Sequence, residues 1–478
     1  MMFHREELIS YVASLMFLAL TALLMALWVL PPDAGERLFG IIVTRAEPTT
    51  EDVEILTIEE IVQPEKIREL DANSNMKQLI SDLDDGLTSL EITDLADRDF
   101  TLELDPTDSD MELLYRKGEF GGRSKAGRQA AVKRYGGTVE SEQAVNAGLV
   151  WLQSIQQSDG SWHFARVGPE AAAGRFSRTE VGATSLALLC FLGAGHTHAN
   201  DGPYRETVEK GLSYIGSQAE IVQGTADLRG QYEGNAGMYV QGLATICISE
   251  AHALDRQNKD LEKLTDMAVN FIEKAQDPVG GGWRYQPRDS PGDTSVVGWQ
   301  VMALQSARAG RIRVSSSVLR NARLFLRSAQ ADTDGSQYKY IPDRGGAKDS
   351  MTAVALLCRM YLGWGRDFEP LKKGVHYLAS RGPSPSDMYY NYYATQVLHH
   401  WGDELWDQWN LKMRTRLVTT QVREGPAAGS WRPTDGHGQT GGQLYQTALS
   451  VLTLEVYYRH LPIYQRLEQG STDSTVTD

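Results

Sequence analysis

The chain has 478 residues, of which 41% are hydrophobic, so it is long enough for two or three domains and can bury a large core. Its formal net charge of −15 lies in one segment, because residues 47–112 hold 21 acidic and 4 basic residues and the remainder is close to neutral. The helical region described below has no continuous basic surface of the kind that a phosphate backbone requires, so the sequence argues against nucleic-acid binding.

A short N-terminal tail, residues 1–8, precedes an apolar segment. Residues 9–30 carry no charge over 22 positions, which at ~1.5 Å per residue is roughly 33 Å of helix, enough to cross a bilayer core. A cleaved signal peptide is the alternative, but the segment is long for one and no small-x-small cleavage site follows it. The sequence predicts a single-pass transmembrane anchor. With so few residues before it, we expect the rest of the chain on the extracytoplasmic, periplasmic side.

Residues 31–114 are poor in aromatic residues and lack a sustained hydrophobic period, so we expect an acidic, largely disordered linker. Such a linker is suited to a basic partner. Residues 115–138 then become basic and rich in glycine. We interpret them as a flexible collar that partly neutralises the linker, with a contact to lipid headgroups as the alternative.

From residue 139 to residue 462 the sequence predicts helical hairpins that repeat. In the first hairpin, apolar residues follow the i, i+3, i+4, i+7 rule of a helix that ends near Gln156. Second helices are expected to begin near Thr179, Met238, Thr294, Ser350, Met388 and Gln443. The intervals between these beginnings are 59, 56, 56, 38 and 55 residues. A repeat of this size is typical of stacked units that cannot bury their apolar faces alone.

The second helices are rich in small and apolar residues on all sides, which predicts a buried inner ring, and the first helices carry charge on one face, which predicts an outer ring. Six such hairpins closed on themselves form an all-α (α/α)6 toroid. Cys190, Cys247 and Cys358 lie far apart in apolar helical stretches, so we expect buried, unpaired thiols. Residues 463–478 are polar and are expected to form a disordered tail.

The turns inside the hairpins share a motif. Gln156, Gly160 and Trp162 recur as Gln276, Gly281 and Trp283 and again as Gln421, Gly429 and Trp431. The motif resembles the Gln–Trp repeat of squalene cyclases and protein prenyltransferase β subunits, and the chain is similar to a membrane-anchored bacterial type of this terpenoid cyclase and prenyltransferase superfamily. The resemblance implies an α/α toroid. In it the glutamine amide would bind backbone groups at a helix end while the indole packs over the turn.

The catalytic groups of that superfamily are not reproduced. Class II terpene cyclases use an Asp-x-Asp-Asp acid, but Asp82-Leu83-Asp84-Asp85 precedes the toroid, where a solvated carboxylate keeps an ordinary pKa. Prenyltransferases bind zinc through aspartate, cysteine and histidine, and the aligned positions here hold Asp293, Ser295 and Thr352. Because hydroxyls are poor zinc ligands, we expect no zinc site, no other metal and no cofactor.

The loops that lead into the inner helices converge at one mouth of such a ring, so their polar and aromatic residues are the candidate ligand-binding site. The candidates are His163, Arg166, Arg284, Tyr285, Asp293, Tyr340, Asp343, Asp349, Tyr389, Tyr390, Tyr392, Trp431, Arg432 and His437. Structural roles are the alternative, with the aspartates as helix caps and the aromatic residues as packing. No residue is assigned a catalytic role.

Two functions remain open. The first is a membrane-anchored binding module that holds a protein, a glycan or an isoprenoid ligand at the mouth of the toroid. The second is a divergent isoprenoid enzyme, a terpene cyclase or prenyltransferase-like protein, whose aromatic wall would stabilise a carbocation. A deep, dry aromatic cavity with an unpaired acid would favour the enzyme and a shallow, polar mouth the module. We prefer the module.

Overall fold

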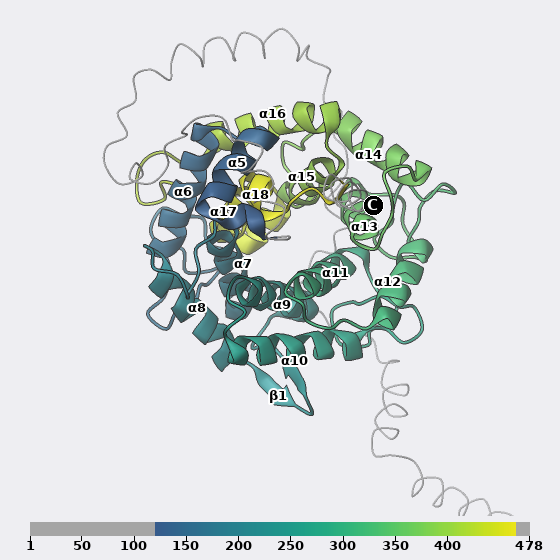
Figure 1. The fold of residues 1–478 in the computed structure, drawn as a ribbon, viewed down its shortest axis with the longest axis horizontal. Coiled ribbons are helices and arrows are strands. Elements are labelled where there is room, and N and C mark those ends of the chain that lie inside the picture. The colour runs from purple at the N-terminus through teal and green to yellow at the C-terminus, as the bar shows by residue number, and fades with distance from the viewer. Residues whose placement is uncertain (1–119, 465–478) are drawn as a thin grey trace, which may run out of the picture. The chain divides into compact units, whose positions relative to one another are not determined.

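The computed structural model describes residues 120–464, which lie within one compact unit of the chain. Figure 1 shows these residues as two concentric rings of helices. The inner ring contains α7 (Glu180–Gly193), α9 (Gly237–Leu254), α11 (Thr294–Ala309), α13 (Asp349–Tyr361), α15 (Met388–Trp401) and α17 (Gly436–Leu454). The outer ring contains α6 (Val139–Ser154), α8 (Arg205–Ser217), α10 (Lys259–Ala275), α12 (Ser316–Ser328), α14 (Glu369–Arg381) and α16 (Asp403–Thr420).

The inner ring is closed. Each inner helix contacts the next along the chain and α17 contacts α7, while α16 contacts α6 in the outer ring. The expected all-α toroid of six hairpins is therefore confirmed for the described residues. The anchor (9–30), the acidic linker (31–114), the first residues of the collar (115–119) and the tail beyond residue 464 lie outside them. No helix within 120–464 is long and apolar enough to span a membrane.

The predicted beginnings of the inner helices agree with the structure to within one residue for five of the six. The exception is α17, which begins at Gly436 rather than near Gln443, because its first turn is separated from the rest by a break at Gly442, where φ is 69°. The burial pattern follows the two rings. In α11 every residue from Thr294 to Leu304 is buried, whereas α10 buries one face only, as its composition predicts.

The glutamine and the tryptophan of the repeated motif tie each turn to its helices. Gln276 Nε2 donates to the carbonyl oxygens of Gly281 and of Val318 on α12, both at 2.9 Å, and Trp283 Nε1 donates to the carbonyl of Ile272 at 2.8 Å. The same bonds recur through Gln156 and Trp162 in the first hairpin and through Gln421 and Trp431 in the last. The role expected of the motif is confirmed, and the glutamine in addition joins neighbouring outer helices.

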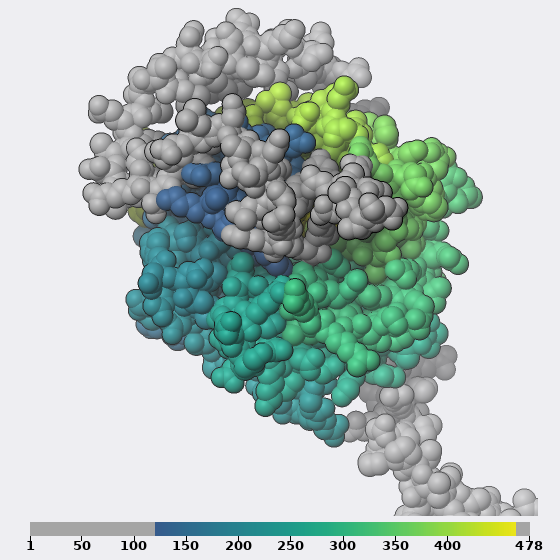
Figure 2. All heavy atoms as spheres, viewed as in Figure 1, coloured from purple at the N-terminus to yellow at the C-terminus, as the bar shows by residue number. Residues whose placement is uncertain are grey.

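The glycine of the motif is required by close packing. Gly281 has φ 73°, and a Cβ atom there would lie 2.4 Å from the carbonyl oxygen of Asn321 on α12. The turn therefore approaches the next outer helix more closely than any side chain would allow. Figure 2 shows side chains filling the spaces between the ribbons in the teal and green part of the ring.

The basic collar is not flexible where the structure describes it. Residues Gly121–Arg123 form the 3-10 helix η2 and Lys125–Tyr135 form α5, and both pack with α18 (Val456–Arg459) at the carboxyl ends of the inner helices (Figure 1). The expectation of a flexible segment was wrong because two of its arginines are partners of buried acids. Arg128 Nε lies 2.6 Å from Glu142, and Arg123 reaches Glu250 on α9 at 2.8 Å.

Glu250 is the centre of a buried ionic triad. Arg459 on α18 contacts the second oxygen of the same carboxylate at 3.1 Å, and it donates to the hydroxyl of Tyr392 at 3.0 Å. The side chains of all three charged residues are at most 1% exposed. The two cations hold the pKa of Glu250 below its usual value although burial alone would raise it. The triad fixes η2 and α18 against the inner ring.

Two smaller features complete the described chain. A hairpin of β1 (Glu220–Val222) and β2 (Thr225–Asp227) follows α8, and the 3-10 helix η3 (Gly234–Ala236) leads into α9. The three cysteines are buried and free, as expected from their spacing.

Candidate functional site

The site lies at the amino-terminal ends of the inner helices, where Asp293 begins α11. Its carboxylate accepts a hydrogen bond from the backbone N–H of Val296 at 2.8 Å, so it acts as the helix cap that the sequence predicts. The side chain is fully buried. A carboxyl group in such a position needs further polar partners, and two loops and two inner helices supply them.

Hydroxyl groups surround the Asp293 carboxylate. Ser295 donates to Oδ1 at 3.0 Å and Tyr340 donates to Oδ2 at 3.3 Å. The hydroxyl of Tyr340 also lies 2.5 Å from that of Tyr285, and the hydroxyl of Tyr239 on α9 hydrogen bonds with Ser295. We call these five residues the Asp293 cluster. It links residues from the second, third and fourth hairpins in one hydrogen-bonded chain.

The charge state of Asp293 is set by competing effects. Burial raises its pKa to about 6, and the hydrogen bonds from Val296, Ser295 and Tyr340 and the nearby guanidinium of Arg284 oppose that rise. At neutral pH the group is mainly ionised, and its hydroxyl partners stabilise the carboxylate. Asp293 is thus a partnered acid rather than an isolated proton donor.

Asp293 is expected to make the protein less stable as the pH rises. Its native pKa of about 6 exceeds the value of about 3.9 in an unfolded chain, so the stabilising contribution is complete below about pH 4 and is lost on rising through about pH 6. The loss is on the order of 3 kcal/mol, at about 1.4 kcal/mol per pH unit. Urea unfolding of the wild type and of Asp293→Asn between pH 4 and pH 7 measures it, because asparagine still caps a helix but does not titrate. A difference between the two proteins that is constant with pH would contradict the assignment.

An aromatic wall stands beside the Asp293 cluster. The ring of Trp299 on α11 stacks on Tyr392 at 5.9 Å and meets the edge of Tyr393 at 5.6 Å, and Tyr389 lies 5.0 Å from Tyr393. Tyr389 is only half-buried, and its hydroxyl forms no hydrogen bond of normal geometry among the described residues. Its ring also lies 6.5 Å from that of His437, which is exposed. Tyr389 thus combines a half-buried side chain with a hydroxyl that is itself buried and has no partner among residues 120–464.

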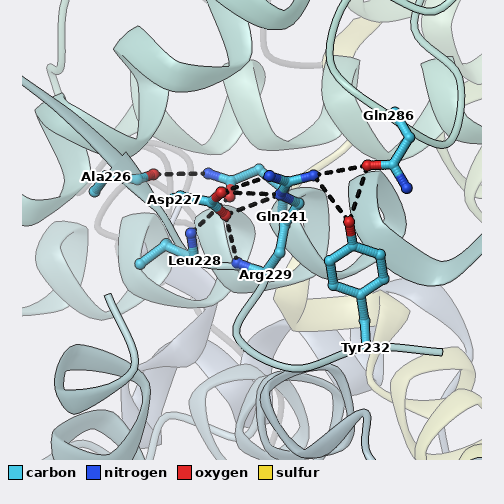
Figure 3. Close-up of polar contacts among 7 residues, drawn as sticks. All are labelled: Ala226, Asp227, Leu228, Arg229, Tyr232, Gln241 and Gln286. Atoms are coloured by element: carbon cyan, nitrogen blue, oxygen red, sulfur yellow. Dashed lines mark hydrogen bonds and ion pairs between the residues drawn. The ribbon is translucent and has the colours of Figure 1, made fainter. Parts of the chain in front are cut away.

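The loop that carries Arg284 and Tyr285 is held from outside the ring. Figure 3 shows Gln286, the next residue, accepting hydrogen bonds from Arg229 and Tyr232, both at 2.9 Å. Arg229 is itself paired with Asp227 at 2.6 Å. This network fixes the position of the loop. Arg284 lies with its guanidinium 5.0 Å from the ring centre of Tyr285, and its Nε has no hydrogen-bond partner among residues 120–464.

The structure thus brings six predicted residues together, from the third to the sixth hairpin: Arg284, Tyr285, Asp293, Tyr340, Tyr389 and His437. Other predicted residues serve the fold. Tyr390 donates to the carbonyl of Gly382 at 3.3 Å, Trp431 forms the repeat turn, and Tyr392 backs the wall while binding Arg459.

The remaining predicted residues lie apart from the Asp293 cluster. His163 is buried next to Glu180 at 3.4 Å, and burial lowers its pKa. Asp349 accepts hydrogen bonds from Tyr377 at 2.5 Å and from Arg381 at 2.8 Å. Three further candidates are exposed: Arg166, Asp343 and Arg432.

Tyr239 and Ser295 belong to the site but were not among the predicted residues. A signal for them exists in the repeat, because Tyr239, Ser295 and Tyr389 each follow by one residue the predicted beginning of an inner helix. Equivalent positions of the repeats lie at the same level of a closed ring. The prediction of Tyr389 as a site residue could therefore have been extended to Tyr239 and Ser295. Trp299 and Tyr393 are likewise equivalent, five residues after that beginning.

The positions aligned with prenyltransferase zinc ligands have other partners. Ser295 bonds to Asp293, and the hydroxyl of Thr352 accepts a hydrogen bond from the backbone N–H of Tyr338 at 3.1 Å. The same threonine bond is made in the first and last hairpins by Thr184 and Thr447. Thr352 is therefore a part of the repeat turn. Within residues 120–464, no group of three or more His, Cys, Asp or Glu side chains is arranged to hold a metal ion.

Comparison with known proteins gives similarities of fold. No protein-family model matches the chain, and no curated protein matches it. Among solved structures, the GH76A alpha-1,6-mannanase from Salegentibacter sp. HEL1_6 is 12% identical with a TM-score of 0.47, over 67% of this chain and 98% of that chain. An inactive variant of it in complex with alpha-1,6-mannotriose is 13% identical with a TM-score of 0.47, over 67% and 99%. A novel alpha-amylase from Clostridium perfringens is 7% identical with a TM-score of 0.47, over 66% and 98%. At this level of identity, the similarities assign neither an activity nor a ligand to this chain.

Proposed function

We propose that the toroid is a binding module whose mouth takes a glycan, and that it acts without zinc or cyclase acid chemistry. The observation that carries the proposal is the Asp293 cluster beside Tyr389 and Arg284. It combines hydroxyl groups and a guanidinium with half-buried aromatic rings, and the buried Asp293 carboxylate orients the hydroxyls of Ser295 and Tyr340.

A sugar ring needs this combination of groups. Its hydroxyls donate and accept hydrogen bonds, which phenol and guanidinium groups can match, and its C–H faces pack on aromatic rings. A peptide that binds as an added strand would need an exposed sheet edge, and the only β-hairpin within 120–464, β1 with β2, follows α8 at a distance in sequence from these residues. An isoprenoid tail would offer no hydrogen bond to Arg284 Nε, which has no partner among residues 120–464. A polyhydroxylated ligand therefore fits the site best.

Removal of two phenol hydroxyls tests the proposal. We expect the full-length protein in detergent to bind members of an oligosaccharide panel, and Tyr285→Phe combined with Tyr389→Phe to weaken that binding about tenfold. The estimate takes about 0.5–1.5 kcal/mol for each hydrogen bond. Isothermal titration calorimetry measures the affinities. Tyr214→Phe, on the outer helix α8, is the matched control and should bind as the wild type does. Failure of the wild type to bind any glycan, or full affinity in the double variant, would refute the proposal.

A divergent isoprenoid enzyme is the second candidate. The wall of Trp299, Tyr389 and Tyr393 favours it, since aromatic faces stabilise cations, and Asp293 is a buried acid. Against it, the carboxylate has hydrogen-bond partners and its pKa of about 6 is unsuited to protonating an alkene. Incubation with labelled polyprenyl substrates decides between the two candidates. Turnover that disappears in Asp293→Asn would establish the enzyme in place of the module.

We further propose that residues 9–30 anchor the module in a membrane with the toroid on the extracytoplasmic side. The support is the uncharged length of that segment, which is sufficient to cross a bilayer core. Protease added to cells whose outer membrane alone has been permeabilised should digest a C-terminal tag. Protection of the tag until the inner membrane is broken would reverse the orientation.

A further inference from the structure

A second polar space lies between the two rings, beside the repeat turn of the last hairpin. It is a cavity of about 120 Å³ bounded by α15, α16 and the loop that precedes α17. Its polar lining comes from Asn391, Arg416, Thr420, Arg432, Thr434 and Gln446. A water molecule has a share of about 30 Å³ in the liquid, so the cavity has room for a few waters or one small polar group, but not for a drug-sized ligand.

The charged residues that line this cavity are all basic. Two arginines line it and no acidic residue does. Among residues 120–464 neither Arg416 nor Arg432 forms an ion pair, and Arg416 is held only by a hydrogen bond to the carbonyl of Pro385. Burial lowers the pKa of Arg416, and no neighbouring carboxylate counters that effect. A half-buried guanidinium without a counter-ion is costly, so the cavity favours an anion.

Some of the neutral residues that line the cavity already use their hydrogen-bonding groups within the protein, and Gln446 does not. Asn391 uses both ends of its amide on the backbone of Ser384, at 2.8 and 2.9 Å, and the hydroxyl of Thr420 donates to the carbonyl of Arg416. Gln446 is 4% exposed, and its Oε1 has no hydrogen-bond partner among the described residues. Since a carboxamide can present its N–H₂ end after a rotation, Gln446 is a buried donor available to a ligand.

We propose that this cavity binds one small oxyanion group, a carboxylate, sulfate or phosphate, between Arg416 and Arg432 with Gln446 as a further donor. A planar guanidinium with paired N–H groups matches the geometry of such oxyanions. The group can be a free inorganic ion or the acidic substituent of a larger molecule. The inference rests on the two arginines and the cavity, and it holds whether or not the mouth binds a glycan.

Titration of the full-length protein in detergent tests this inference. Inorganic phosphate, sulfate and glucuronate are added separately at constant ionic strength, and binding is followed by calorimetry. We expect saturable binding of at least one of them, and a loss of at least tenfold in affinity in Arg416→Gln and in Arg432→Gln. Lys412→Gln, an exposed cation on the same helix and outside the cavity, should bind as the wild type does. Because Arg432 is exposed, Arg432→Gln should fold normally even if Arg416→Gln does not.

The outcomes separate the sources of the oxyanion. Binding of all three probes identifies the oxyanion itself as the ligand, and binding of glucuronate alone identifies an acidic sugar. Absence of saturable binding by all three probes overturns the inference. An equal loss in Lys412→Gln and in Arg432→Gln also overturns it, because it would indicate a general effect of net charge.

Discussion

Replacement of Trp283 by alanine should lower the free energy of unfolding by ~3–5 kcal/mol, the range for loss of a large buried aromatic side chain. The indole is 1% exposed, and its Nε1 donates to the carbonyl of Ile272 at the end of α10. The substitution removes that bond and leaves a cavity under a turn whose Gly281 already touches α12. Chemical denaturation followed by circular dichroism of the full-length protein gives the difference.

The control for Trp283 is an aromatic residue outside the core. Phe368 is 43% exposed, so Phe368→Ala should have a much smaller effect. A loss below about 1 kcal/mol in Trp283→Ala, the typical size for any single substitution, would show that the turn repacks without its indole.

Neutralisation of Glu250 is the second large expected effect. Glu250→Gln keeps the shape of the side chain but leaves Arg123 and Arg459 as buried cations without their counter-ion, and breaking such a buried pair costs ~3–5 kcal/mol. Denaturation curves of wild type and variant measure the loss. In an exposed pair, Lys259 with Glu262, the matched change Glu262→Gln should have no measurable effect.

A neighbouring acid can reduce the effect at Glu250. Glu455 is fully buried, neither of its carboxyl oxygens has a hydrogen-bond partner among residues 120–464, and burial raises its pKa well above the usual value. In Glu250→Gln it can ionise and serve Arg459 instead. The double variant with Glu455→Gln should therefore be less stable than Glu250→Gln. If both the single and the double variant are as stable as the wild type, the triad does not contribute to the stability of the fold.

The features predicted well from the sequence are those encoded locally. The hydrophobic period locates the inner helices, and the spacing of Gln276, Gly281 and Trp283 predicts a turn whose bonds lie within one hairpin and its neighbour. Asp293 as a helix cap is a local feature as well. Such interactions leave a pattern in the sequence because the partners are few residues apart or repeat at a fixed interval.

The features that were missed depend on partners far away in the chain. Arg123 is 127 residues from Glu250, and Gly-rich basic composition around it indicates a flexible segment when that partner is unknown. The Asp293 cluster has the same character, since Tyr239 and Tyr340 meet there from hairpins on either side of α11. Position within the repeat, rather than residue type, is the information that would have identified Tyr239 and Ser295.

The hydrogen bond from Gln421 to the carbonyl of Ala144 joins the last outer helix to the first, across 277 residues. During synthesis, one apolar side of the first hairpin therefore remains exposed until the sixth hairpin has been synthesised and can pack against it. An open array of repeats has two terminal units both before and after it loses one repeat. A closed ring has none, and the loss of one repeat creates two units that each lack a neighbour. Closure of the ring therefore fixes the number of hairpins in this protein. Unlike a solenoid, it cannot gain or lose whole repeats in evolution without breaking the ring.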